Sequence, residues 1–275
     1  MRSRTWASDP GTTPRARIRR CCGRCRIPRA LGVAWRDDVS VNDHLNNTID
    51  PRPDTDGAEC ACPADSRIAR HFDAKVAERL ASGRDPGLVP VSERLRDALL
   101  SFGPADRTLL EVGCGRGGLL LALTQAGAAS ATGVDLSAAS IDAARNRFEQ
   151  AQLSDRVRLS VGDAARIPLE SQDWVILDRV MCCYPEIERL LANTLPAARR
   201  LYAFTVPSSR GWRGVIARLE EWLENAWNSL RGRPCPGYVH DLDLIEERLT
   251  SAGFRLRHRD HQRLWHLAIY ERSAP

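Results

Sequence analysis

Lysine is almost absent from this sequence of 275 residues. Lys75 is the single lysine among 40 basic residues, so the other 39 are arginines. So uniform a bias is more typical of genome composition than of binding chemistry, and it lowers the weight of arginine-rich runs as signs of nucleic-acid binding. It also excludes the Tyr-x-x-x-Lys pair that one common type of dehydrogenase uses, because no lysine stands at that spacing.

Long hydrophobic runs are missing as well. A helix that spans a bilayer needs about 18 or more consecutive apolar residues, and no run in this sequence approaches that length. Arg19 and Arg20 form a pair near the start, but no apolar stretch follows them, so we expect neither a secretory nor a twin-arginine signal. We therefore expect a cytoplasmic protein, in which the nine cysteines are reduced thiols or metal ligands.

The net charge of +5 is unevenly distributed along the chain. Residues 1–36 contain ten arginines and one acid, Asp9, and so carry +9, which leaves −4 for the remainder. Residues 1–64 show no sustained helical or strand periodicity and are rich in Arg, Pro, Asp, Asn and Thr. We expect them to form a largely disordered leader, followed by one folded domain over residues 65–275.

Two alternatives for this leader stay open. Cys22 and Cys25 have CxxC spacing, and Cys60 and Cys62 could complete a four-thiolate zinc site. The second pair is CxC, however, and the segment between the pairs has no structural pattern. The ten arginines could form a nucleic-acid-binding arm, but few aromatic residues are interleaved with them. We favour the disordered extension and predict no metal site and no nucleic-acid partner.

The folded domain begins with two predicted amphipathic helices, residues 66–82 and 90–102, whose apolar residues recur at helical spacing. From residue 107 the pattern alternates between strand and helix, which favours a doubly wound, mostly parallel sheet. The predicted strands are Thr108–Val112, Ala131–Asp135, Val157–Gly162, Trp174–Asp178 and Leu201–Val206. The predicted helices are Gly118–Gln125, Ala138–Gln152 with Ser137 as its N-cap, Ile187–Arg199, Trp212–Leu230 and Leu242–Ala252.

The end of the chain breaks this alternation. Phe254–His261 and Leu264–Arg272 are extended runs joined by a short polar turn, with no crossover helix, and they predict an antiparallel β-hairpin. The expected fold class is therefore α/β: a Rossmann-like, mostly parallel sheet of seven strands that ends in an antiparallel hairpin. This layout leaves no room for the separate substrate domain that a dehydrogenase usually carries.

The segment LLEVGCGRGGLL leaves two kinds of site open. Residues 113–118 satisfy G-x-G-x-x-G, the fingerprint of a dinucleotide-binding turn. The same segment satisfies a second pattern, an acidic residue followed by G-x-G-x-G, formed by Glu111, Gly113, Gly115 and Gly117. That pattern opens the S-adenosylmethionine (SAM) site of methyltransferases. Both sites need glycine, because the backbone turns sharply after a strand and a ligand approaches it closely.

Four motifs in order resemble the class I SAM-dependent methyltransferases, and the resemblance covers roughly residues 66–275. In the first, LLEVGCGRG, the resemblance implies that Glu111 suits the cationic methionine end of SAM, directly or through water and the loop amides. In the second, TGVDLS, Asp135 stands 22 residues after Gly113, where a carboxylate can accept both ribose hydroxyls. These two motifs supply the predicted cofactor-binding residues Glu111, Gly113, Cys114, Gly115, Gly117, Asp135 and Leu136.

The third and fourth motifs follow the next two strands. In SVGDAARIPL, Asp163 resembles the acid that accepts from the adenine amino group, and Ala164 follows it. In WVILDRVMCCYPE, Asp178 ends its strand beside the sulfonium and the acceptor. Ligands of open α/β sheets bind at the carboxyl ends of the strands, where all four motifs fall. The resemblance therefore predicts a SAM-dependent methyltransferase, with an NAD(P)-dependent oxidoreductase or a non-catalytic SAM-binding regulatory module as alternatives.

The segment MCCYPE follows Asp178 at the expected mouth of the site. Cys182 and Cys183 are interpreted as core thiols, with Tyr184-Pro185 starting the next helix. The alternative is that the loop faces the acceptor, with Tyr184 bonded to it and a thiol that holds a soft metal or is modified. The stretch resembles a bacterial subgroup with a Cys-Cys-Tyr-Pro motif here, whose members are likened to the magnesium-protoporphyrin O-methyltransferases.

Methyl transfer from a sulfonium is an in-line displacement, in which an enzyme mainly aligns the reactants and excludes water. A carboxylate acceptor needs no base, whereas a phenol or an amine does, and Asp178, Tyr184 and His240 are the candidate catalytic residues. We expect a small-molecule acceptor, which could be a tetrapyrrole-like carboxylate. We expect the helices of residues 66–102 and 212–252 to form a lid over the acceptor. Trp222 is expected to lie in the core.

Overall fold

The computed structural model describes residues 64–83, 87–230 and 237–273. The predicted disordered leader, with its two cysteine pairs, lies outside the described residues, so those predictions stay predictions.

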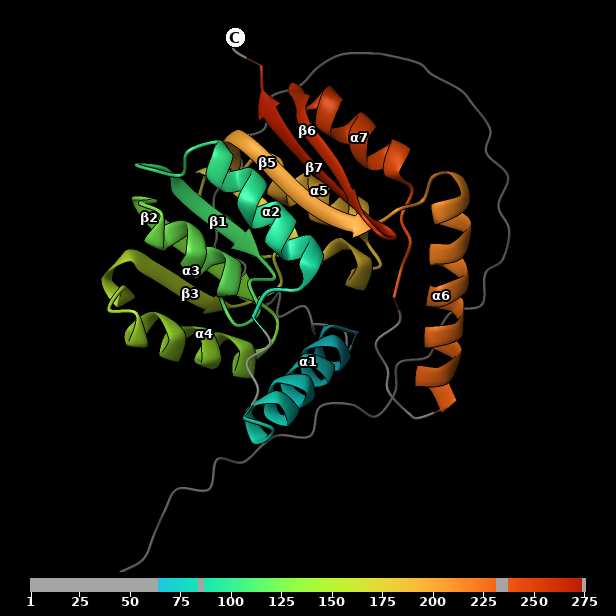
Figure 1. Cartoon of the computed structure of the whole chain (residues 1–275), viewed down its shortest axis with the longest axis horizontal. Coiled ribbons are helices and arrows are strands. Elements are labelled where there is room, and N and C mark those ends of the chain that lie inside the picture. Colours follow the sequence, from blue (N-terminus) through green and yellow to red (C-terminus); the bar gives the residue numbers. More distant parts are fainter. Residues whose placement is uncertain (1–63, 84–86, 231–236, 274–275) are drawn as a thin grey trace, which may run out of the picture. The chain divides into compact units, whose positions relative to one another are not determined.

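One sheet of seven strands organises the described part of the chain (Figure 1). Its strand order is β3-β2-β1-β4-β5-β7-β6, with β1 to β5 parallel and the last two strands antiparallel to their neighbours. The predicted fold class is confirmed, including the terminal hairpin. The strands are β1 Thr108–Val112, β2 Ser130–Asp135, β3 Val157–Val161, β4 Gln172–Asp178, β5 Ala198–Pro207, β6 Phe254–Gln262 and β7 Trp265–Arg272.

The predicted helices are all present; α3 has its predicted bounds, α5 ends five residues early, and the other five differ from prediction by one or two residues at one or both ends. The helices are α1 Ala64–Ala81, α2 Pro90–Ser101, α3 Gly118–Gln125, α4 Ala138–Gln150, α5 Ile187–Thr194, α6 Gly211–Leu230 and α7 Leu242–Ser251. Two short 3₁₀ turns, η1 Ser154–Arg156 and η2 Met181–Cys183, complete the set. Ser137 caps α4 as predicted, because its side chain accepts a hydrogen bond from the Ser140 N–H at 3.0 Å.

The prediction for α5 was right at its start, Ile187, and wrong at its end. The helix stops at Thr194 with Leu195, still in helical conformation, as its C-cap, because Pro196 has no N–H with which to continue the helical hydrogen bonds. Ala198 already pairs with Gln172 and begins β5. The interpretation that Tyr184-Pro185 starts this helix was wrong, since Pro185 lies between η2, which ends at Cys183, and the helix, which begins at Ile187.

Apolar side chains cover both faces of the sheet. On one face, buried residues of α5 and α7 pack against the sheet; on the other, buried residues of α2, α3 and the end of α4 do so. This two-sided burial explains the continuous apolar runs in β4 and β5. Because both faces of the sheet are covered, a ligand can bind only at the edge formed by the carboxyl ends of the parallel strands.

Helix α6 turns its apolar side outward. The exposed fractions of Trp212, Trp222 and Trp227 are 65%, 65% and 55%, so the prediction that Trp222 lies in the core was wrong. Gly214 and Ala217 form the buried side of the helix, because any side chain at position 214 would collide with the backbone of Ser209. Within the described segments, no helix is both long enough and apolar enough to cross a membrane.

Candidate cofactor-binding site

A cleft opens at the carboxyl ends of the parallel strands. It is formed by the glycine loop after β1, the turns after β2 and β3, the segment after β4, and one side of α1. Its lining residues are Ile68, Phe72, Val112, Gly113, Gly115, Val134, Asp135, Leu136, Ser140, Gly162, Asp163, Ala164, Arg179, Val180, Cys183, Tyr184 and Leu190.

The glycine loop needs its glycines for two different reasons. Gly113 has φ of 65°, and a Cβ there would collide with Val180. Gly115 has φ of 51° and faces open space, with no described atom within 4 Å of where a Cβ would lie, so a ligand can approach its backbone. Gly117 is the N-cap of α3. Cys114 is buried beneath the loop, and burial raises the pKa of its thiol, which therefore stays protonated.

Asp135 connects this loop to the next turn. Its two carboxylate oxygens accept hydrogen bonds from the N–H groups of Gly115 and Ser137, each at 2.8 Å. Burial raises the pKa of Asp135, and the two backbone hydrogen bonds oppose that rise. The carboxylate is held rigidly in the wall of the cleft and keeps further lone pairs for a ligand.

Asp163 and Tyr184 form a second polar group of the cleft. The Tyr184 hydroxyl lies 2.9 Å from both carboxylate oxygens of Asp163, to which it donates. The carboxylate also accepts from the Ala165 N–H at 3.0 Å and pairs with Arg166 at 3.0 Å. Tyr184 follows Asp178 of the fourth motif in the sequence, but in the structure its hydroxyl contacts Asp163 of the third motif.

Glu111 and Asp178 do not line the cleft. Glu111 is buried, and its Oε2 has no hydrogen-bond partner among the described residues. Burial is the main cause that raises its pKa, and the charge of Asp178 adds to it. Asp178 itself accepts from the Ser92 hydroxyl and, at 2.7 Å, from the Thr205 hydroxyl. Burial raises its pKa, against these two hydrogen bonds.

His240 lies behind the segment that follows β4. Its Nε2 is 2.9 Å from the carbonyl oxygen of Met181 and 2.8 Å from that of Tyr184, so the proton sits on Nε2 and points at both. Burial lowers the pKa of His240, which keeps the ring neutral. The residue braces this segment and does not line the cleft.

The two thiols of the segment differ in their surroundings. Cys182 is buried, whereas Cys183 lines the cleft, and their sulfurs are 3.7 Å apart. Within the described ranges, no group of three or more His, Cys, Asp or Glu side chains is placed to hold a metal ion.

Sequence patterns did not identify four further residues of the site. Ile68 and Phe72 of α1 and Val180 line the cleft, and Arg179 joins them with a left-handed φ of 58°. The amphipathic pattern predicted helix α1, but only its packing against α4 reveals which side covers the site. An arginine in left-handed conformation beside a cleft carries no sequence signature.

Asp73 holds α1 against the amino end of α4. Its Oδ1 accepts from the Ser137 hydroxyl at 2.5 Å and from the Ala139 N–H at 3.1 Å, at the amino end of α4. Asp73→Ala removes both bonds, so we expect about 3- to 10-fold weaker cofactor binding, the loss of roughly 1 kcal/mol. Hydrogen exchange of the α1 amides should become faster at the same time.

Glu78→Ala is the matched control for Asp73→Ala, because Glu78 is exposed on the same helix. It should change neither cofactor affinity nor exchange. Unchanged exchange in Asp73→Ala would show that the bonds to α4 do not hold α1 in place.

Part of the chain resembles known proteins in sequence. Residues 109–200 match the family model described as "Methyltransferase domain". The ribosomal protein L11 methyltransferase of Pasteurella multocida is 30% identical over 118 residues, which cover 39% of this chain and 40% of that protein. The chain spans about half or less of the length of the first curated relatives that it matches.

Solved structures resemble the fold over most of the chain. Magnesium protoporphyrin IX methyltransferase from Synechocystis PCC 6803, with bound S-adenosylhomocysteine (SAH), has a TM-score of 0.61 and 18% identity, covering 76% of this chain and 99% of that one. The cyclase SpnF has a TM-score of 0.59 and 15% identity, covering 77% and 96%. The described part of the chain therefore has the class I methyltransferase fold. Residues 109–200, from β1 into β5, are the part of this fold that matches the methyltransferase family model.

Proposed function

We propose that this protein is a SAM-dependent methyltransferase that acts on a small molecule. The observation that carries the proposal is the pairing of Gly115 and Asp135. An open glycine backbone and a fixed, half-buried carboxylate face the same cleft, and Asp163 lies in that cleft as well. This is the donor and acceptor set that a nucleoside with a charged tail requires.

The residues present fit SAM. Asp135 would accept from the ribose hydroxyls, and Asp163 with the Ala164 backbone would hold the adenine. The loop from Gly113 to Gly117 would approach the methionine portion, and the unpartnered Oε2 of Glu111 behind that loop would face its positive charge. When bound, SAM supplies a methyl group on a sulfonium. Ile68 and Phe72 would exclude water from it, because they cover the cleft from α1.

The acceptor is inferred from the state of the three candidate bases. Asp178 accepts hydrogen bonds from two hydroxyl groups, Tyr184 donates one to Asp163, and His240 directs its Nε2–H at two carbonyl oxygens. These contacts favour an acceptor that needs no deprotonation, of which a carboxylate is the simplest. A tetrapyrrole-like carboxylate is our specific proposal, supported by the fold neighbour named for magnesium protoporphyrin IX.

Calorimetric titration of the full chain with SAM, SAH and NADH tests the proposal. We expect binding of the first two at about micromolar Kd and none of NADH. Binding of NADH alone would overturn the proposal in favour of an oxidoreductase. If SAM binds, turnover to SAH with porphyrin carboxylates tests the acceptor, and binding without turnover on any acceptor favours a regulatory module.

A further inference from the structure

A second pocket lies at the amino end of α6 and shares no lining residue with the cofactor cleft. Its volume is about 260 Å³. The wall includes Ser208 after β5, Gly211 at the start of α6, and side chains of the β6–β7 hairpin. Because Thr205 of β5 pairs with Asp178 of β4, both sites stand at the same edge of the sheet.

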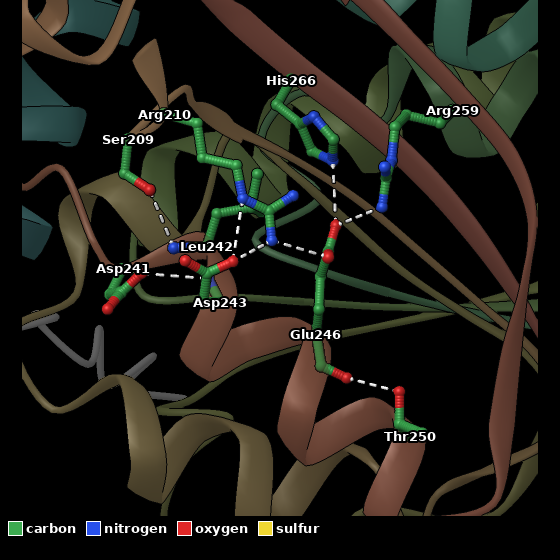
Figure 2. A network of polar contacts seen from close by, with 9 residues as sticks. All are labelled: Ser209, Arg210, Asp241, Leu242, Asp243, Glu246, Thr250, Arg259 and His266. Atoms are coloured by element: carbon green, nitrogen blue, oxygen red, sulfur yellow. Dashed lines mark hydrogen bonds and ion pairs between the residues drawn. The ribbon is translucent and has the colours of Figure 1, made fainter.

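Two of the pocket's arginines are neutralised by neighbours on α7. Figure 2 shows Arg210 bonded to Asp243 and, at 2.8 Å, to Glu246. The other oxygen of Glu246 accepts from Arg259 at 2.7 Å. These contacts hold the two guanidinium groups in fixed positions beside the pocket, with two carboxylates to balance them.

Arg213 adds a third guanidinium that is not balanced. No described carboxylate pairs with it, and its buried Nε has no hydrogen-bond partner in the described ranges. Its guanidinium carbon lies 5.2 Å from the ring centre of Trp212. The pocket therefore carries one more positive charge than its carboxylates cancel.

Two histidines of the hairpin complete the pocket, and three of their buried ring nitrogens have no hydrogen-bond partner among the described residues. His266 is 0% exposed, and neither of its ring nitrogens has a hydrogen-bond partner among the described residues. Its Nε2 lies 3.8 Å from Glu246, too far for a hydrogen bond. The buried Nδ1 of His261 is unpartnered too, and the two rings are 5.0 Å apart. An unsatisfied buried polar group is costly, which points to a ligand.

Burial and the neighbouring positive charges together disfavour the protonated form of the His266 ring. Burial is the main cause that lowers its pKa to about 4, and His261, Arg259 and Arg210 add to it, while Glu246 opposes them. The ring is therefore neutral at pH 7 and presents one N–H donor. An anion placed beside these cations would reverse part of the shift and favour the protonated ring.

The amino end of α6 contributes further donors. The first helical hydrogen bond joins the Gly214 N–H to the Arg210 carbonyl at 3.0 Å. The N–H groups of residues 211–213 precede it and have no acceptor within the helix. Together with the helix dipole of this 20-residue helix, such groups attract negative charge.

We propose that this pocket binds a compact anionic group, a carboxylate or a phosphate, through Arg213, the amino end of α6 and the two histidines. This anionic group is either part of the methyl acceptor or a free anion. Only the first assignment rests on the proposed function; the binding of an anion in this pocket does not depend on it. Trp265 lies between the two sites: its ring is 5.3 Å from the guanidinium carbon of Arg179 in the cofactor cleft, and it lines a neighbouring hollow together with Trp212 and Arg213 of the second pocket.

Titration of the full chain with inorganic phosphate, followed by NMR of the histidine rings, tests the site. We expect saturable shifts of both His261 and His266, and a higher ring pKa in the complex. Arg213→Gln should weaken phosphate binding at least about tenfold, whereas Arg218→Gln, on the exposed side of α6, should not. Both variants should keep the wild-type Tm and affinity for SAH. Absence of saturable shifts, or equal affinity in Arg213→Gln, overturns the site.

Phenyl phosphate and benzoate separate the two sources of the anion. Tighter binding of these than of inorganic phosphate, with Trp212 and Trp265 beside the pocket, assigns the site to an anionic acceptor. Equal or tighter binding of inorganic phosphate assigns it to a free ion and overturns the acceptor assignment. Binding of SAH is measured in a separate titration. If phosphate binds and SAH does not, the anion site is supported and the proposed function is rejected.

Discussion

Asp135→Ala is expected to weaken SAM binding about 30- to 150-fold, the equivalent of roughly 2–3 kcal/mol. The carboxylate lies in the cleft wall, and both of its oxygens are oriented by backbone N–H groups at 2.8 Å. Alanine removes the acceptor for the ribose and also releases the Gly115 N–H, so ligand contact and loop position are lost together. Calorimetry with SAM measures the change.

Two further variants sharpen this result. Asp135→Asn keeps the shape and one oxygen acceptor, so we expect an intermediate loss of affinity. Asp142→Ala removes an acid on the outside of α4 that, in the described part of the chain, pairs with Arg145 at 2.8 Å, and it should leave SAM affinity unchanged. Wild-type affinity in Asp135→Ala would refute the proposed ribose contact.

Glu111→Gln should stabilise the free protein increasingly as the pH rises. Because burial raises the pKa of Glu111 above its ordinary value of 4.5, the unfolded chain ionises before the folded one does. Folding stability contributed by this group is therefore lost as pH rises from about 4.5 toward the folded pKa. Glutamine does not ionise, so the difference in free energy of unfolding should grow by up to about 1.4 kcal/mol per pH unit in that window.

Chemical denaturation of both proteins between pH 4 and pH 8 measures this difference. Asp178 and Asp135 also have raised pKa values and are present in both proteins. Because their charges help to raise the pKa of Glu111, the difference includes the repulsion between Glu111 and these two acids. Glu149→Gln, an exposed site on α4, should stay within about 0.5 kcal/mol of wild type at each pH. A difference that does not change with pH would show that Glu111 is not a buried, repelled carboxyl group.

The regular part of the fold could be predicted because its signals are local. The bounds of β1 and α3 agree with prediction, since a strand, a glycine turn and an apolar helix follow each other within residues 108–125. The end of α5 was missed, because pairing of β5 with β4 draws residues 198–200 into the sheet. Trp222 was misplaced because an apolar stripe does not reveal whether it faces the core or solvent.

The sequence alone determined the alternation of strand and helix, the glycine turn, and the acids at strand ends. Tertiary structure decided which acids face the cleft: Asp135 and Asp163 do, whereas Glu111 and Asp178 are held behind it. The reason is that hydrogen-bond partners and burial come from distant segments. Ser92, which bonds Asp178, is 86 residues away from it, and Asp73 is 64 residues from Ser137. The unpartnered ring nitrogens of His266 likewise became visible only once α6, α7 and the hairpin had enclosed them.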